Sequence, residues 1–268
     1  MTIYVSRNYH EEYRSWAAAG DVPMLDGIVA RTVPEHDARK ILQSVPPPSK
    51  GSVTDIGCGS ATLLRKIADD PKFAGCALNG ILPSAEEVAL TRALCDEQVG
   101  PNRIFIGEGS AISTGIPPSS QDCVYMNQMF HYLTPETAPN ALAEVFRILR
   151  PGGIIFIGGL PDQDEFAHLE QAETAWSLLW KTVTTPPILR RTPAALARVL
   201  RYAVTRRGFL LKLQTPFFAT PMEFTTSLAT AGFTAVTVAR YTMVGPDGSD
   251  VEHVCRWDYT ATRPAVGS

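Results

Sequence analysis

The chain lacks several features that would assign it to a simple class. None of its 268 positions begins a run of eighteen apolar residues, and the first twenty residues carry acids and a histidine, so we expect neither a membrane-spanning helix nor a secretory signal. Its five cysteines are scattered and never spaced CxxC, which argues against a disulfide framework and a zinc site. We therefore expect reduced, mostly buried thiols, no metal and a cytoplasmic location.

The chain also has few charged residues and no internal sequence repeat. Charged residues make up 19% of the chain and the net charge is −3, which does not suit a protein that binds nucleic acid along its whole length. No internal period of 20 to 50 residues occurs, which argues against solenoids and propellers. Hydrophobic residues reach 45%, enough for one substantial core, so the chain is not disordered.

Short apolar segments alternate with helical patterns along most of the chain. The predicted strands are 51–56, 76–82, 103–106, 122–126 and 154–157, and the predicted helices are 62–68, 85–95 and 138–149, with a break at 150–153. Such alternation predicts an α/β fold, a mainly parallel sheet with helices on both faces. After a helix at 222–231, two β-rich segments flank Gly245-Pro246-Asp247-Gly248, which predicts an antiparallel C-terminal hairpin at one edge.

The order of these segments predicts four regions. Residues 1–48 form an N-terminal helical lid that ends in three prolines, and residues 49–160 form the α/β core. Residues 161–221 are too long for a loop and form a helical cap insertion. Residues 222–268 supply the helix and hairpin that complete the core.

A glycine-rich turn, Gly57-Cys58-Gly59-Ser60-Ala61, joins the first strand to the following helix. In open parallel sheets, ligands bind at the carboxyl ends of the strands, where this turn lies. Glycines let the backbone approach a ligand closely, and a helix start offers free N–H groups to a carboxylate or phosphate. The turn therefore predicts a ligand site, although a tight turn without a ligand would have the same sequence.

Four ordered motifs place this turn in a wider context. They are residues 53–61, Gly107-Glu108-Gly109, residues 122–127 and residues 149–153. In order and spacing, the chain resembles the class I S-adenosylmethionine-dependent methyltransferases over residues 51–160 and again at 222–238. The resemblance implies a Rossmann-like sheet, S-adenosylmethionine as methyl donor, S-adenosylhomocysteine as product and a small-molecule acceptor.

The resemblance also implies residue roles on the donor side. Asp55, Gly57, Cys58 and Gly59 would surround the methionine portion and ribose. Glu108 would bind the adenine amine, with the backbone at Gly109 and Ser110 nearby, and Asn127 would shape the pocket.

One departure from the family concerns the ribose. Leu82 stands where the family usually has an acid that binds both ribose hydroxyls, and leucine cannot accept a hydrogen bond. Glu87 aligns with a glutamine that reaches the ribose in members without that acid; alternatively, Glu86 and Glu87 are first-turn acids that stabilise the helix dipole. If neither reaches the ribose, a cofactor-binding protein that does not methylate becomes the alternative function.

On the acceptor side, His131 is the candidate catalytic base, because it follows the fourth strand; a packed His-Tyr pair is the alternative. Gln128 would line the acceptor pocket. Tyr9 and Tyr13 would close over it, unless their helix merely packs on the core.

The predicted cap carries the substrate signal. Eight basic residues and no acid occur between Lys181 and Lys212, among them Arg190 and Arg191. They would clamp a carboxylate or phosphate of the acceptor, contact an anionic membrane surface, form a solvated face or, in last place, bind nucleic acid. Trp176 and Trp180 would wall an apolar pocket or pack in the core. We therefore expect methyl transfer to a small, anionic and partly apolar molecule, with O-methylation favoured over C- or N-methylation and the oligomeric state open.

Overall fold

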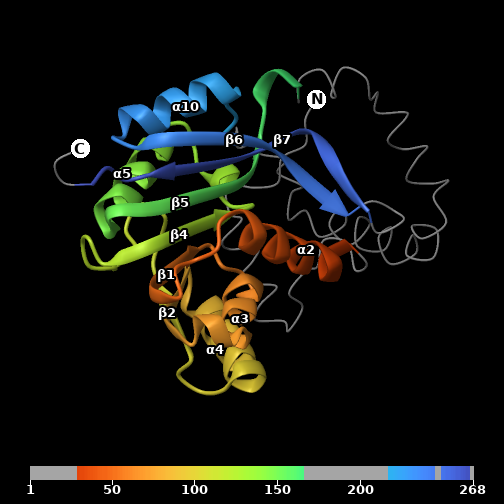
Figure 1. Cartoon of the computed structure of the whole chain (residues 1–268), viewed down its shortest axis with the longest axis vertical. Helices are drawn as coiled ribbons and strands as arrows, with labels where there is room; N and C mark the ends of the chain where they lie inside the picture. Colours follow the sequence, from red (N-terminus) through yellow and green to blue (C-terminus); the bar gives the residue numbers. More distant parts are fainter. Residues whose placement is uncertain (1–28, 166–216, 245–248, 266–268) are drawn as a thin grey trace, which may run out of the picture. The chain divides into compact units, whose positions relative to one another are not determined.

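The computed structural model describes residues 29–165, 217–244 and 249–265 (Figure 1). The chain divides into two compact units, and nearly all of the described residues belong to the unit built from residues 10–162 and 216–268. The fold described below is the fold of that unit.

The unit is organised around a seven-stranded sheet in the order β3-β2-β1-β4-β5-β7-β6. β1 to β5 pair in parallel, whereas β7 pairs antiparallel with both β5 and β6. The strands therefore confirm the predicted parallel sheet and its antiparallel C-terminal pair at one edge. Their bounds are β1 Lys50–Ile56, β2 Gly75–Leu82, β3 Ile104–Glu108, β4 Gln121–Asn127, β5 Leu149–Pro161, β6 Thr234–Val244 and β7 Asp250–Thr262.

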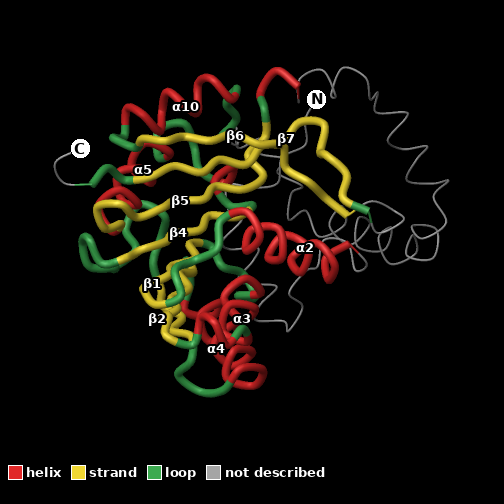
Figure 2. The backbone as a smooth tube through the Cα atoms, viewed as in Figure 1, coloured by secondary structure: helices red, strands yellow, loops and turns green. Residues whose placement is uncertain are grey.

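Helices cover both faces of this sheet (Figure 2). The period of two along β4 shows why: Val124 and Met126 belong to a core with α5 and α10, whereas Cys123 and Tyr125 belong to a second core with α2, α3 and α4. A central parallel strand must be apolar on both sides, which explains its continuous apolar sequence. The helices are α2 Val29–Ser44, α3 Thr62–Asp69, α4 Ala85–Val99, α5 Ala138–Ile148 and α10 Pro221–Thr230, with short 3₁₀ helices η1 Pro71–Phe73 and η2 Phe130–Tyr132.

Local capping fixes where two of these helices begin. The Ser84 hydroxyl accepts a hydrogen bond from the Glu87 backbone N–H at 3.3 Å and caps α4, as its sequence predicts. Thr220 and Glu223 form a reciprocal capping box at the start of α10.

The predicted break at 150–153 is wrong, because β5 runs through it. The register with β4 shifts between Gln121 and Cys123, so the extra residues form a bulge. Gly152 takes a φ of +81° there, and its N–H donates to the Arg263 carbonyl at 2.8 Å. The glycines bend the strand without ending it.

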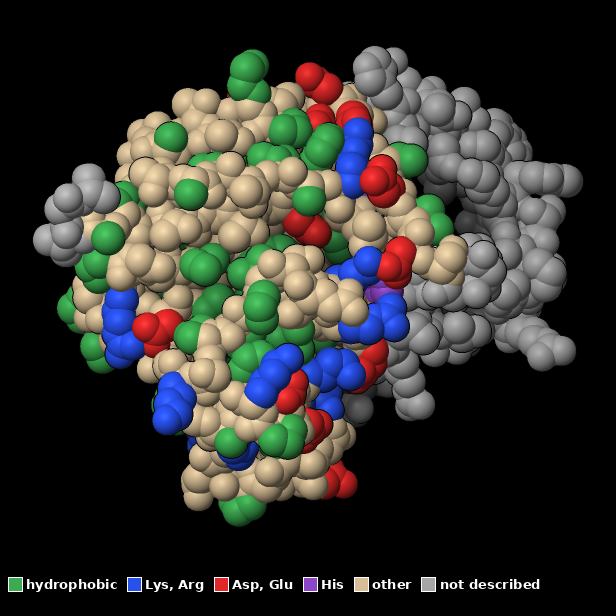
Figure 3. Space-filling model, in the orientation of Figure 1, with side chains coloured by type: hydrophobic (Ala, Val, Ile, Leu, Met, Phe, Trp, Pro, Cys, Tyr) green, Lys and Arg blue, Asp and Glu red, His purple; other side chains and the backbone are tan. Residues whose placement is uncertain are grey.

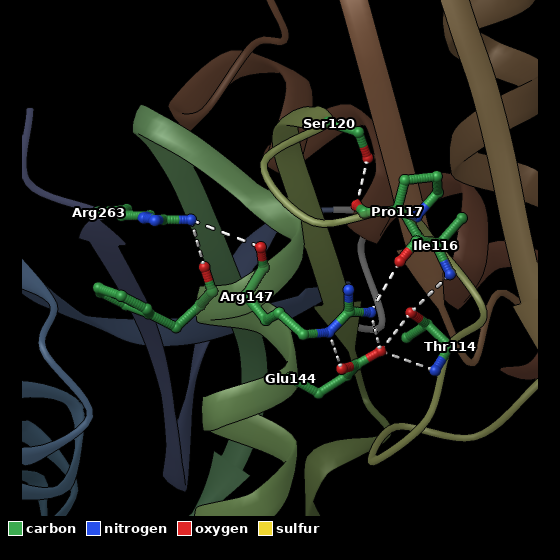
Figure 4. Close-up of polar contacts among 8 residues, drawn as sticks. Thr114, Ile116, Pro117, Ser120, Glu144, Arg147 and Arg263 are labelled. Carbon is green, nitrogen blue, oxygen red and sulfur yellow. Dashed lines mark hydrogen bonds and ion pairs between the residues drawn. The ribbon is translucent and has the colours of Figure 1, made fainter.

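A polar network ties the loop after β3 to α5 (Figure 4). Glu144 accepts hydrogen bonds from the Thr114 N–H at 2.9 Å, the Thr114 hydroxyl at 2.6 Å and the Arg147 Nε at 2.6 Å. Arg147 also donates to the Ile116 carbonyl at 2.7 Å. The hydrogen bond from Arg147 and those from Thr114 lower the pKa of Glu144 to about 2, so this carboxylate is ionised at neutral pH.

The sequence predicted buried thiols and no membrane-spanning helix. All five cysteines are free thiols, and all but the half-buried Cys58 are buried. Of the helices in the described ranges, none has the length and apolarity needed to cross a bilayer.

Candidate functional site at the carboxyl edge of the sheet

The glycine turn takes the shape that its sequence predicts. Gly57 and Gly59 have φ angles of +75° and +53°, in the left-handed region that glycine adopts without strain. The Gly57 N–H donates to the Ile81 carbonyl at 2.8 Å, which ties the turn to β2. A Cβ built on Gly59 would meet no heavy atom within 4 Å, so the backbone there borders open space.

The turn leads into a helix start with free backbone donors. Ala61 stands at the N-cap of α3 in a left-handed conformation (φ 56°) and makes no side-chain cap hydrogen bond. The first N–H groups of α3 are therefore available to an anionic group of a ligand. Thr91 on α4 holds the turn from behind, because its hydroxyl donates to the Gly59 carbonyl at 2.8 Å.

A cavity of about 250 Å³ lies against this turn. It brings together six residues predicted from the sequence: Asp55, Gly57, Cys58, Gly59, Asn127 and Gln128. Helix α2 also lines the cavity, through Asp37, Ala38 and Ile41. α2 lies within the predicted N-terminal lid, but sequence reasoning did not single out these three residues.

Asp55 is the most unusual group in the cavity wall. Its side chain is 5% exposed, and no hydrogen bond to it occurs within the described ranges. Burial raises the pKa of Asp55 to about 8. A buried carboxylate without a partner is costly, so this site favours a ligand that brings a cationic or donor group.

Cys58 is not a nucleophile in this setting. Burial, and then the neighbouring Asp55 carboxylate, raises the pKa of its thiol well above the ordinary value. The thiol therefore stays protonated at neutral pH, and its role in the turn is packing.

The residues predicted to bind adenine lie on the same edge of the sheet. Leu82 at the end of β2 pairs in register with Glu108 at the end of β3, and the Gly109 N–H donates to the Leu82 carbonyl at 2.8 Å. Glu108 and Ser110 are exposed, and Leu82 is buried. A Cβ on Gly109 would lie 2.9 Å from the Thr114 carbonyl, so glycine is needed for this close approach. None of these residues lines the 250 Å³ cavity.

The two acids at the start of α4 differ in environment. Glu86 is exposed, whereas Glu87 is 4% exposed and close enough to Cys58 to raise the thiol pKa further. Glu87 therefore lies near Cys58 of the glycine turn. Its contact with the ribose stays a prediction.

The end of β4 carries a polar cluster that joins distant segments. Asn127 donates through Nδ2 to Asp37 Oδ2 at 2.9 Å, and the Tyr241 hydroxyl of β6 donates to Asp37 Oδ1 at 2.9 Å. Gln128 has a φ of +54° and accepts through Oε1 from the Arg256 Nη1 of β7 at 2.5 Å. Sequence reasoning missed Asp37, Tyr241 and Arg256, since only tertiary packing brings them to this edge.

His131 follows this cluster on η2. Its side chain is half-buried, its ring lies 4.2 Å from that of Tyr132, and its Nδ1 is buried with no hydrogen-bond partner in the described part of the chain. Burial, and then the Arg256 guanidinium, lowers the pKa of His131 to about 3, so the imidazole is neutral at physiological pH. It does not line the cavity, and its role as a base stays a prediction.

The remaining predicted residues lie outside the described ranges. They are Tyr9 and Tyr13 of the lid and Trp176, Trp180, Arg190 and Arg191 of the cap.

Comparison with known proteins agrees with this geometry. A family model described as a methyltransferase domain matches residues 53–153, which span the glycine turn and the end of β4. The matched range covers less than half of the chain, and over this range the chain is similar to the methyltransferases that its motifs resemble.

Among the curated relatives, a malonyl-[acyl-carrier protein] O-methyltransferase from Pectobacterium atrosepticum is 30% identical over 52% of this chain and 49% of its own length. A trans-aconitate 2-methyltransferase from Rhodopseudomonas palustris is 26% identical over 54% of this chain and 52% of its own. The chain thus spans about half the length of these two relatives.

A solved structure shares the fold over a greater length. A structure described as the complex between the Haloferax volcanii Trm112 methyltransferase activator and the putative methyltransferase aligns with a TM-score of 0.61 at 17% identity, over 94% of this chain and 98% of that one. At this identity the likeness shows the fold alone.

Proposed function

We propose that this protein transfers a methyl group from S-adenosylmethionine to a small-molecule acceptor. The observation that carries the proposal is the cavity at the carboxyl edge of β1 and β4. A glycine turn, free helix N–H groups and the Asp55 carboxylate meet there, and Asp55 has no hydrogen-bond partner among the residues that the structure describes. The amino-acid end of the donor carries an ammonium and a carboxylate, which complement these two kinds of group.

The methyl carbon of the donor is the electrophile, so the chain's main task is positioning. The glycine turn and α3 would hold the amino-acid end, and Glu108 with the Gly109 backbone would hold the adenine. Asn127 and Gln128, at the end of β4, would face the reacting end. His131 stays the predicted base for a hydroxyl acceptor, but its lowered pKa of about 3 makes the neutral imidazole a weak one, which favours an acceptor that is already ionised.

The acceptor in this proposal is a small molecule with an anionic group and an apolar body, methylated on oxygen. Two matched relatives act, by name, on malonyl and trans-aconitate compounds, both of which contain carboxylates. The basic segment of the predicted cap supports the same charge, with Arg190 and Arg191 as the expected clamp.

Isothermal titration calorimetry with S-adenosylmethionine and S-adenosylhomocysteine tests the donor assignment. We expect dissociation constants in the micromolar range for both, and binding of neither would refute the enzyme function. Binding of both without any transfer would favour the cofactor-binding alternative.

The acceptor class is tested with a donor labelled in its methyl group. The protein would be offered a panel of unsaturated and aromatic carboxylic acids beside their amides. We expect label in the acids alone, recovered as esters. Transfer to the amides at the same rate as to the acids, or to the amides alone, would contradict an anionic acceptor.

A further inference from the structure

One acidic side chain in the donor cavity comes from outside the segment that the family model matches. Asp37 lies on α2, sixteen positions before the matched range begins at residue 53. It lines the same cavity as Asp55 and is 4% exposed. No comparison assigns it a role.

The surroundings of Asp37 leave it able to bind a further donor. Its two oxygens accept from Asn127 Nδ2 and from the Tyr241 hydroxyl, both at 2.9 Å. A carboxylate has about four acceptor positions, so each oxygen can take another hydrogen bond. His36 also acts on Asp37: its Nδ1 lies 3.7 Å from Oδ1 and lowers the Asp37 pKa, less than the Asn127 and Tyr241 hydrogen bonds do, while its Nε2 lies 2.7 Å from Asp250 Oδ1.

The charge of the cavity wall points to a cation. Among the lining side chains Asp37 and Asp55 are the ionisable acids, and no Lys or Arg lines the cavity within the described residues. Burial raises the pKa of both carboxyls, and for Asp37 it outweighs its hydrogen bonds from Asn127 and Tyr241. Two desolvated carboxyls bordering one cavity are stabilised by a group that carries positive charge and several N–H donors.

We infer that Asp37 binds the ammonium group of the donor's amino-acid end, opposite Asp55, so that α2 forms part of the donor site. This inference rests on the proposed function. The ammonium has three N–H donors, which suits two carboxylates from two elements. The donor's carboxylate is left to the N–H groups at the start of α3.

Helix α2 also contacts β7 through polar side chains away from the cavity, and this contact supplies a control variant. Asp250 of β7 accepts from His36 at 2.7 Å and pairs with Lys40, and it does not line the cavity. In Figure 3, basic and acidic side chains lie next to one another on the surface over α2 and α3. Asp250→Asn therefore loosens α2 without changing the cavity wall, whereas Asp37→Asn removes a charge from the wall.

Two probes that differ in the amino-acid end separate binding from positioning. S-Adenosylhomocysteine has the ammonium and the carboxylate, and 5′-methylthioadenosine has neither. By calorimetry at pH 7.5, we expect Asp37→Asn to weaken S-adenosylhomocysteine binding at least tenfold and to change methylthioadenosine binding less than twofold. Asp250→Asn should change both by less than twofold, and circular dichroism would verify that each variant is folded.

Three results would overturn the inference. Equal weakening of both probes by Asp37→Asn would make Asp37 a support for α2, and tighter S-adenosylhomocysteine binding would place it beside the donor's carboxylate. An unchanged affinity would remove Asp37 from the site while leaving the proposed function intact. If the unmodified protein binds neither probe, the proposed function fails together with the inference.

Discussion

Because the Asp55 carboxyl is buried, we expect its ionisation to lower the stability of the folded protein. Between the ordinary pKa of 3.8 and about 8, the unfolded chain has released the Asp55 proton whereas the folded chain retains it. The folded state therefore loses stability as pH rises through this window, and above pH 8 the full cost remains. Asp55→Asn removes the titration and keeps the shape, so the variant should be more stable than the unmodified protein at pH 8.

The magnitude follows from the size of the shift. A rise from 3.8 to about 8 is roughly four pH units, and at about 1.4 kcal/mol per unit the upper limit is about 6 kcal/mol. The carboxyl borders a cavity that water enters, and an effective dielectric constant near 20 reduces such costs. We expect the free energy of unfolding of Asp55→Asn, relative to that of the unmodified protein, to rise by about 2 kcal/mol from pH 5 to pH 8.

Urea unfolding at pH 5 and pH 8 measures this difference. Glu97→Gln is the matched control, because Glu97 is an exposed acid on α4 and makes the same change from acid to amide. The control should show no gain over the same interval. If Asp55→Asn is no more stable than the unmodified protein at pH 8, Asp55 has a partner that compensates its charge and the argument for the donor's ammonium loses its basis.

Two further predictions concern the network and the turn. Glu144→Ala leaves the buried Thr114 N–H without its acceptor and should cost about 2 kcal/mol in urea unfolding at pH 7. Because the pKa of Glu144 is lowered to about 2, this loss should shrink as pH falls from 4.5 towards 2, and a constant loss would contradict the ion pair with Arg147. Gly59→Ala places a methyl in open space at a φ of +53°, so it should lower stability by about 1 kcal/mol and weaken S-adenosylhomocysteine binding at least tenfold. Unchanged calorimetric affinity would show that the donor does not approach this turn.

Sequence patterns predicted the local elements well because each is determined by neighbouring residues. The short apolar runs of β1 and β4, the glycines at 57 and 59 and the Pro83-Ser84 cap all appear where expected. The same logic failed at residues 150–153, where a proline and two glycines predicted a break. There the pairing of β5 with β4 and with the chain beyond β7 absorbs the irregularity as a bulge.

What the sequence alone determined is the glycine turn and the side chains directly before and after it, because a strand, a turn and a helix are encoded within about fifteen consecutive residues. The cavity wall opposite the turn depended on tertiary structure. Asp37 is separated from Asn127 by 90 positions and from Tyr241 by 204, and their hydrogen bonds form only when α2 packs across the ends of β4 and β6. Contacts between such distant segments follow from the packing of whole elements, which no local spacing of residues encodes.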